Sequence, residues 1–261
     1  MQVSIATRNL RCAGRVDSRT TVRRDIWTVD RGPAGKPCRL ARWGHYGTPV
    51  LLYPSAGADC LEVERCGLIG ALAELIDAGR IKIYSPDACA PRAWLARGGS
   101  LTERAQVLAA CSQHTRTAIV PRIRSDCESP AIEIVAAGAA LGALTALASL
   151  LGDPDAFRAA VALSGVFENL GYVRGPLEPA ARATLPALAS LVATAAPRIR
   201  ERRVLLAAGR GDYEVPGETE RAAAALEAHG IPRRVELWGA DAEHGFATWR
   251  RMLPRYLAEL A

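Results

Sequence analysis

The chain has 261 residues, of which 49% are hydrophobic and 5% aromatic. This length and apolar content provide a packed core, and we expect a single domain spanning residues 1–261. The net charge is +6, but the arginines occur in pairs scattered along the chain rather than in one patch. Scattered charge with few aromatics is typical of a solvated surface, so we expect no nucleic-acid partner.

The first elements are two segments that alternate polar and apolar residues, at 21–30 and 36–47. The sequence RGPAG between them is typical of a turn. Half-exposed strands joined by a short turn pair in an antiparallel manner, so we expect the sheet to begin antiparallel.

Strand-like and helix-like segments then alternate along the rest of the chain. Short apolar runs predict buried strands at 48–54, 80–86, 131–137, 159–165, 203–209 and 234–239. Helical patterns occupy 60–79, 101–123, the segment after Gly142, and 217–230. This alternation predicts an α/β fold with a mostly parallel sheet and helices on both faces. Four prolines within 168–202 indicate broken helices or a small lid there.

Residues 131–151 form an apolar run whose only charge is Glu133. The run is long enough to cross a bilayer. However, it is rich in alanine and glycine, and its first five residues are strand-like whereas the rest are helix-like. We therefore expect a buried strand, a tight turn and a buried helix in series, and no membrane span.

The turn in this run has the outline of a nucleophile elbow, the strand-to-helix turn G-x-S-x-G of α/β-hydrolases. Gly138 and Gly142 occupy the two glycine positions, but Ala140 stands where a serine nucleophile would be. The amide of Leu141 would face a developing oxyanion, and the loop 53–59 would supply a second amide from Ala56 or Gly57.

An acid and a histidine follow the elbow in the order that such enzymes use. Asp212 and Glu214 come after the predicted strand at 203–209, and His244 comes after the strand at 234–239. Either carboxylate could be the acid that orients the histidine.

Four other residues that follow predicted strands are alternative candidates for a nucleophile: Ser55, Cys60, Cys89 and Ser164. None lies on an elbow, so each is better interpreted as a small buried or loop residue. The remaining histidines, His45, His114 and His229, receive no catalytic role; the last two lie on helical segments that look exposed.

The seven cysteines are irregularly spaced and form no C-x-x-C pair, which favours neither a metal site nor a disulfide framework. The first residues lack the continuous apolar segment of a secretory signal. We expect no export and a reducing, cytoplasmic location.

The stretches 43–59, 75–87, 120–127, 132–143 and 153–167, with the segments around 230–239 and 244–257, resemble the esterase family of α/β-hydrolases. This family includes esterase D-like and feruloyl esterases and the mycobacterial mycolyltransferases. The resemblance implies a serine nucleophile, hydrolysis or transfer of an acyl ester, and no cofactor. It also matches His244 to the family histidine and Glu214 to the acid, with Asp212 close enough to substitute. Ala140 departs from the family's serine.

Loss of a catalytic serine typically lowers turnover by about a millionfold. We therefore expect a catalytically impaired pseudoenzyme that binds a small ester-like molecule or a protein partner. The alternative is a serine ester hydrolase or acyltransferase inactivated by a serine-to-alanine change at residue 140. A water polarised by His244 could give feeble hydrolysis, and a homodimer is left open.

Overall fold

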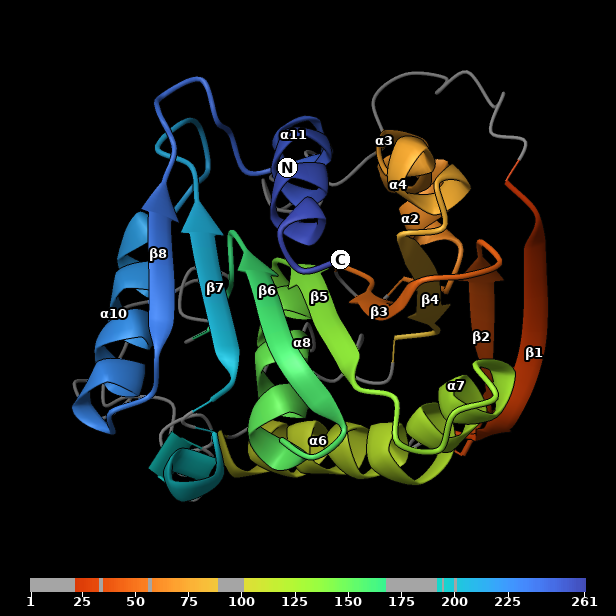
Figure 1. Cartoon of the computed structure of the whole chain (residues 1–261). Coiled ribbons are helices and arrows are strands. Elements are labelled where there is room, and N and C mark those ends of the chain that lie inside the picture. The colour runs from red at the N-terminus through yellow and green to blue at the C-terminus, as the bar shows by residue number, and fades with distance from the viewer. Residues whose placement is uncertain are drawn as a thin grey trace, which may run out of the picture.

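The computed structural model describes residues 22–32, 35–55, 58–88, 101–167, 192–193, 195–199 and 201–261. Eight strands form one sheet in the order β1-β2-β4-β3-β5-β6-β7-β8 (Figure 1). The bounds are β1 Arg24–Arg31, β2 Pro37–Trp43, β3 Thr48–Tyr53, β4 Ile81–Pro86, β5 Ile134–Ala139, β6 Phe157–Leu163, β7 Arg203–Ala208 and β8 Arg233–Leu237.

The sheet is antiparallel at its start and parallel from β4 onward. Strand β1 pairs antiparallel with β2, and β2 pairs antiparallel with β4. All pairs from β4 through β3, β5, β6 and β7 to β8 are parallel. The predicted fold class and the antiparallel N-terminal strands are therefore confirmed.

Helices cover both faces of the sheet, as predicted. Their bounds are α2 Glu62–Arg65, α3 Leu68–Ala71, α4 Ala73–Asp77, α6 Leu101–His114, α7 Val120–Asp126, α8 Leu141–Gly152, α10 Pro216–Ala228 and α11 Phe246–Ala258. Residues of α6, α7, α8 and α10 pack in one apolar cluster, and residues of α2, α3, α4 and α11 pack in a second.

Strand β5 separates the two clusters. Ile134 and Ala136 face the first cluster, whereas Val135 and Ala137 face the second, because successive side chains of a strand point to opposite faces. Burial on both faces explains why this strand is a continuous apolar run rather than an alternating one.

The apolar run at 131–151 folds as a strand, a turn and a helix. Strand β5 ends at Ala139 and α8 begins at Leu141. Among the helices in the described part of the chain, none combines the length and the apolar composition that crossing a bilayer requires.

Two helix predictions differ from the structure. The single helix expected over 60–79 is divided into α2, α3 and α4, because Gly67 adopts a left-handed φ of 76° that ends the first helical turn. The helix expected over 101–123 extends to Asp126 and contains a π-helical segment at Thr115–Ile119. Pro121, just beyond that segment, has no N–H to continue a regular α-helical ladder.

Two other expectations concern residues around the sheet. The lid expected at 168–202 lies almost wholly outside the described residues. Cys66 is disulfide-bonded, whereas Cys60, Cys111 and Cys127 are free thiols. The sequence pattern did not predict the bond at Cys66.

Candidate active site

Ala140 occupies the sharp turn between β5 and α8. Its φ of 52° and ψ of −118° lie in a region that costs an alanine about 1–3 kcal/mol. The main chain holds this conformation on both sides. The Ala140 N–H donates to the Leu163 carbonyl at 3.0 Å, and the Val166 N–H donates to the Ala140 carbonyl at 3.2 Å. The 163–166 segment after β6 therefore fixes the turn.

The two flanking glycines lie where no side chain fits. A Cβ atom on Gly138 would lie 2.3 Å from the Gly142 carbonyl oxygen. A Cβ atom on Gly142 would lie 2.6 Å from the carbonyl oxygen of Pro54, in the loop after β3. The turn is thus closed tightly on itself and against that loop, which is the steric condition of a nucleophile elbow.

Ser164, directly after β6, holds the carboxylate of Glu214. Its Oγ lies 2.5 Å from Glu214 Oε1 and accepts a hydrogen bond from Trp249 Nε1 at 3.0 Å. Because an indole N–H can only donate, the serine's own proton is directed to the carboxylate. The sequence favours a small buried or loop residue over a nucleophile at Ser164, and in the structure Ser164 is buried and hydrogen-bonded to the acid.

His244 lies beside Glu214 and not beside the Asp212 carboxylate. His244 Nδ1 is 3.5 Å from Glu214 Oε2, and the two side chains are 11% and 1% exposed. Asp212 is exposed, and its contact with His244 is through the main chain, where its carbonyl accepts the His244 N–H at 2.9 Å. Of the two acids predicted, Glu214 has the position that orients an imidazole.

The second ring nitrogen of His244 has no partner. Nε2 is buried and makes no hydrogen bond within the described residues. In a serine hydrolase this nitrogen takes the proton of the nucleophile. The imidazole ring also meets the Trp249 indole edge-on, at 5.2 Å between centroids, which fixes its plane.

These groups follow four adjacent parallel strands, β5 to β8. Ala140 follows β5, Ser164 follows β6, Glu214 follows β7 and His244 follows β8, so all four lie beyond the carboxyl ends of these strands. Ligands of open α/β sheets bind at this edge. A continuous series of contacts joins the elbow, through the 163–166 segment, to the acid and the histidine.

The amide predicted to serve an oxyanion is already bonded in this structure. The Leu141 N–H donates to the Ser55 carbonyl at 3.0 Å. Ala56 and Gly57, the candidates for the second amide, lie outside the described residues. The Leu141 amide can serve an oxyanion only if the Ser55 carbonyl moves away.

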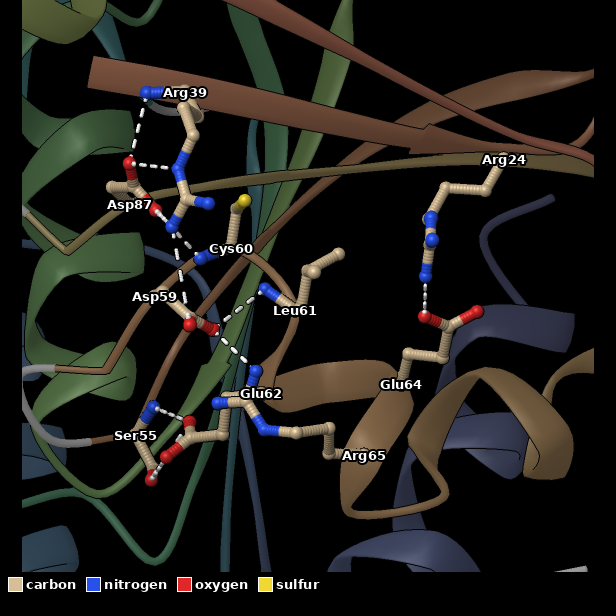
Figure 2. A network of polar contacts seen from close by, with 10 residues as sticks. All are labelled: Arg24, Arg39, Ser55, Asp59, Cys60, Leu61, Glu62, Glu64, Arg65 and Asp87. Atoms are coloured by element: carbon tan, nitrogen blue, oxygen red, sulfur yellow. Dashed lines mark hydrogen bonds and ion pairs between the residues drawn. The ribbon is translucent and has the colours of Figure 1, made fainter. Parts of the chain in front are cut away.

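A buried carboxylate keeps Ser55 in place (Figure 2). The Ser55 N–H donates to Glu62 Oε2 at 2.7 Å, and its hydroxyl donates to the same carboxylate at 3.0 Å. Burial raises the pKa of Glu62, and the hydrogen bonds from Ser55 oppose that shift. Since its hydroxyl is committed to Glu62, Ser55 is a poor nucleophile.

The adjoining network in Figure 2 makes Cys60 unreactive. Asp87 accepts hydrogen bonds from the Arg39 guanidinium and from the Cys60 N–H. Burial opposes ionisation of Asp87, but these bonds outweigh it and lower its pKa. Burial, reinforced by the Asp87 charge, raises the pKa of the Cys60 thiol to about 12, so the thiolate is scarce at neutral pH. Cys89 lies outside the described residues.

The other histidines are remote from these contacts. His45 and His229 are exposed. His114 is 7% exposed in α6, so the expectation that it lies on an exposed helical segment was wrong. His114 is buried because α6 packs against α8.

A mostly parallel sheet, a strand–turn–helix elbow and an acid and histidine on later loops define an α/β-hydrolase. The family described as the prolyl oligopeptidase family matches residues 131–261, and the chain belongs to this family. The expected placement in the α/β-hydrolase superfamily is confirmed. The name of the matching family refers to a peptidase, whereas the family that the sequence motifs resemble consists of esterases. A sequence search of curated proteins found no match.

Solved structures share the fold at low sequence identity. A candidate dipeptidyl aminopeptidase IV from Bacteroides ovatus matches with 14% identity and a TM-score of 0.64, over 91% of this chain and 36% of that one. The chain thus spans about a third of that relative's length. S-formylglutathione hydrolase from Staphylococcus aureus matches with 14% identity and a TM-score of 0.63, over 91% and 95% of the two chains. The enterobactin esterase of Shigella flexneri matches with 19% identity and a TM-score of 0.62, over 93% and 59%.

Proposed function

We propose that this chain is an α/β-hydrolase scaffold without a nucleophile, a catalytically impaired pseudoenzyme that binds a small ester-like molecule or a protein partner. The observation that carries the proposal is the backbone of Ala140, which has the strained geometry of an elbow but ends in a methyl group. A methyl group cannot attack a carbonyl, and such a loss costs about a millionfold in turnover.

The oxyanion side of the site supports the same proposal. The Leu141 amide is bonded to Ser55, so the donor that would stabilise a tetrahedral intermediate is engaged. Removing one oxyanion donor typically lowers kcat by about 10²–10³. With no nucleophile at residue 140 and with the Leu141 amide engaged, we infer that the site retains binding and not catalysis.

The alternative is a serine ester hydrolase or acyltransferase inactivated by replacement of serine at residue 140. The contact between Glu214 and His244, together with the Ser164 bond to Glu214, favours this reading, because a long-decayed site has no need of an oriented imidazole. The family also brings in peptide substrates, so acyl amides join acyl esters as candidate ligands.

The experiment compares wild-type protein, His244→Ala, Ala140→Ser, and Ala140→Ser combined with His244→Ala, each treated with a fluorophosphonate probe. We expect the wild type to be unlabelled, and its hydrolysis of p-nitrophenyl acetate to equal that of His244→Ala alone. Labelling of the wild type at any serine, lost in His244→Ala, would refute the pseudoenzyme.

The restored serine distinguishes the two readings. If Ala140→Ser is labelled and the labelling depends on His244, the acid and base are competent and the inactivated-enzyme alternative gains support. If Ala140→Ser stays unlabelled, the engaged Leu141 amide accounts for it. Turnover of p-nitrophenyl acetate and of a prolyl peptide p-nitroanilide by Ala140→Ser then ranks esters against amides.

A cytoplasmic location stays a prediction. The disulfide at Cys66 counts against it, because disulfides persist mainly in oxidising compartments. Mass spectrometry of the native protein after alkylation without reductant would decide: a blocked Cys66 would refute the cytoplasmic prediction.

A further inference from the structure

A cleft lies at the edge of the sheet opposite to the candidate active site. It has a volume of about 820 Å³, which is within the range of small-molecule sites. Its lining includes Tyr46, Arg80, Lys82, Cys127, Glu133 and Arg158. Cys127 directly follows α7, and the other five come from the amino ends of β3, β4, β5 and β6, whereas Ala140 and His244 lie at the carboxyl edge.

The cleft has an excess of positive charge. Lys82 is neutralised by Asp126 at 3.0 Å, and Glu133 is neutralised by Arg202 at 2.6 Å. Neither Arg80 nor Arg158 lies within ion-pair distance of a carboxylate in the described part of the chain. Among the described residues, neither guanidinium therefore has a carboxylate within ion-pair distance.

Both arginines contact main-chain carbonyls, Arg80 at the last residue of α11 and Arg158 two residues beyond it, but these contacts use few of their donors. Arg80 donates from Nη2 to the Ala258 carbonyl at 2.7 Å, and Arg158 donates from Nη2 to the Leu260 carbonyl and to Thr48 Oγ1. Carbonyls at a helix end carry only partial negative charge. A guanidinium has five N–H donors, so most of them are available to a further acceptor.

Arg158 is held in this position at an energetic cost. Burial lowers its pKa, although Glu133 opposes the shift, and its Nε is buried without a partner in the described residues. A partly buried charge is stabilised when an opposite charge and hydrogen-bond acceptors are supplied. An anion in the cleft would supply both.

Tyr46 adds an aromatic surface at the rim. It is 73% exposed, the highest value among the exposed large hydrophobic side chains of the described residues. An exposed ring that lines the same cleft as two guanidinium groups can stack on a planar ligand whose charged group reaches the arginines.

We propose that this cleft binds a small aromatic anion, with a carboxylate or phosphate group contacting Arg80 and Arg158 and an aromatic ring stacked on Tyr46. The site is independent of the elbow, so its occupancy neither needs nor restores chemistry at residue 140.

The test is calorimetric titration of the full chain with phenyl phosphate, benzoate and inorganic phosphate. We expect saturable binding of phenyl phosphate or benzoate, and the preferred one identifies the anionic group. Arg80→Gln should weaken binding by about tenfold or more, because a charge-assisted hydrogen bond is lost. Tyr46→Ala should weaken the aromatic probes and leave inorganic phosphate unchanged.

Matched controls are Arg23→Gln and Tyr213→Ala. The Arg23 side chain is 85% exposed, and Tyr213 is 55% exposed in the loop after β7. Both should bind the probes as the wild type does. The proposal is overturned if neither aromatic probe saturates in the millimolar range, or if Arg80→Gln and Arg23→Gln behave alike.

Cys127 provides a second measurement that does not depend on altering the cleft's arginines. It is a partly exposed free thiol in the lining. Phenyl phosphate should slow its alkylation by iodoacetamide in the wild type and in His244→Ala alike, with Cys127→Ser identifying the modified peptide. Protection that disappears in His244→Ala would place the ligand at the opposite edge and overturn the proposal.

Discussion

Replacing Ser164 by alanine isolates the hydrogen bond that holds Glu214. Serine and alanine both carry a Cβ, so the positive φ of 46° at this position costs the same in both. What changes is the hydroxyl between Glu214 Oε1 and Trp249 Nε1. A hydrogen bond to a charged group is worth about 1.5–3 kcal/mol, so we expect the free energy of unfolding to fall by about that amount.

For a chain of this size the loss corresponds to a decrease in Tm of about 3–12 °C. Ser85→Ala is the matched control, because Ser85 is also fully buried but its Oγ has no partner in the described residues. That variant should be neutral or slightly stabilised. Thermal and urea unfolding of both variants measure the difference. Equal loss of stability in Ser164→Ala and Ser85→Ala would refute the assignment of a hydrogen bond to Glu214.

Three further predictions concern the buried charges and the elbow. Asp126→Asn leaves the Lys82 ammonium, which is 7% exposed, without its anion, and should cost about 3–5 kcal/mol in urea unfolding. Asp241→Asn, in a pair whose aspartate is 66% exposed, should cost far less, because solvent screens an exposed ion pair, and similar losses in the two variants would contradict the reasoning. Burial raises the pKa of Glu62, so its carboxyl group contributes stability below about pH 4.5 that is lost as the pH rises through the folded-state pKa. Glu62→Gln should therefore flatten that part of the Tm-against-pH curve, and an unchanged curve would count against it. Gly138→Ala places a methyl group against main-chain atoms and should destabilise by about 1–3 kcal/mol or more, whereas unchanged unfolding would show that the turn can open.

The sequence was sufficient for the sheet and for the elbow. Strands β3 to β7 fall on apolar runs whose residue types suit a pleated, buried surface, and those runs are local signals. The strand expected at 234–239 forms as β8, but the expectation that it is buried was wrong, because β8 lies at the edge of the sheet and its residues are partly or fully exposed. The two glycines of the elbow were identifiable because the steric demand of that turn acts over five residues.

The remaining features depend on which segments meet in space. The bond from Leu141 to Ser55 joins residues far apart in the sequence, and no local pattern reports it. The choice of Glu214 over Asp212 depends on the path of one short loop, which turns one carboxylate inward and leaves the other in solvent. The division of the 60–79 helix arose because a glycine that a helix tolerates also permits a left-handed turn.

The turn at residue 140 is stabilised by its neighbours' main chains and not by its own side chain. Exchange of that side chain for a small one therefore leaves the path of the polypeptide intact, and chemistry can be lost or regained there by a single codon change without a new fold. Cysteine or serine introduced at this position would inherit the direction that the scaffold imposes and the burial of Ala140, which is 1% exposed. Measurements of stability alone would therefore not distinguish an active variant at residue 140 from an inactive one.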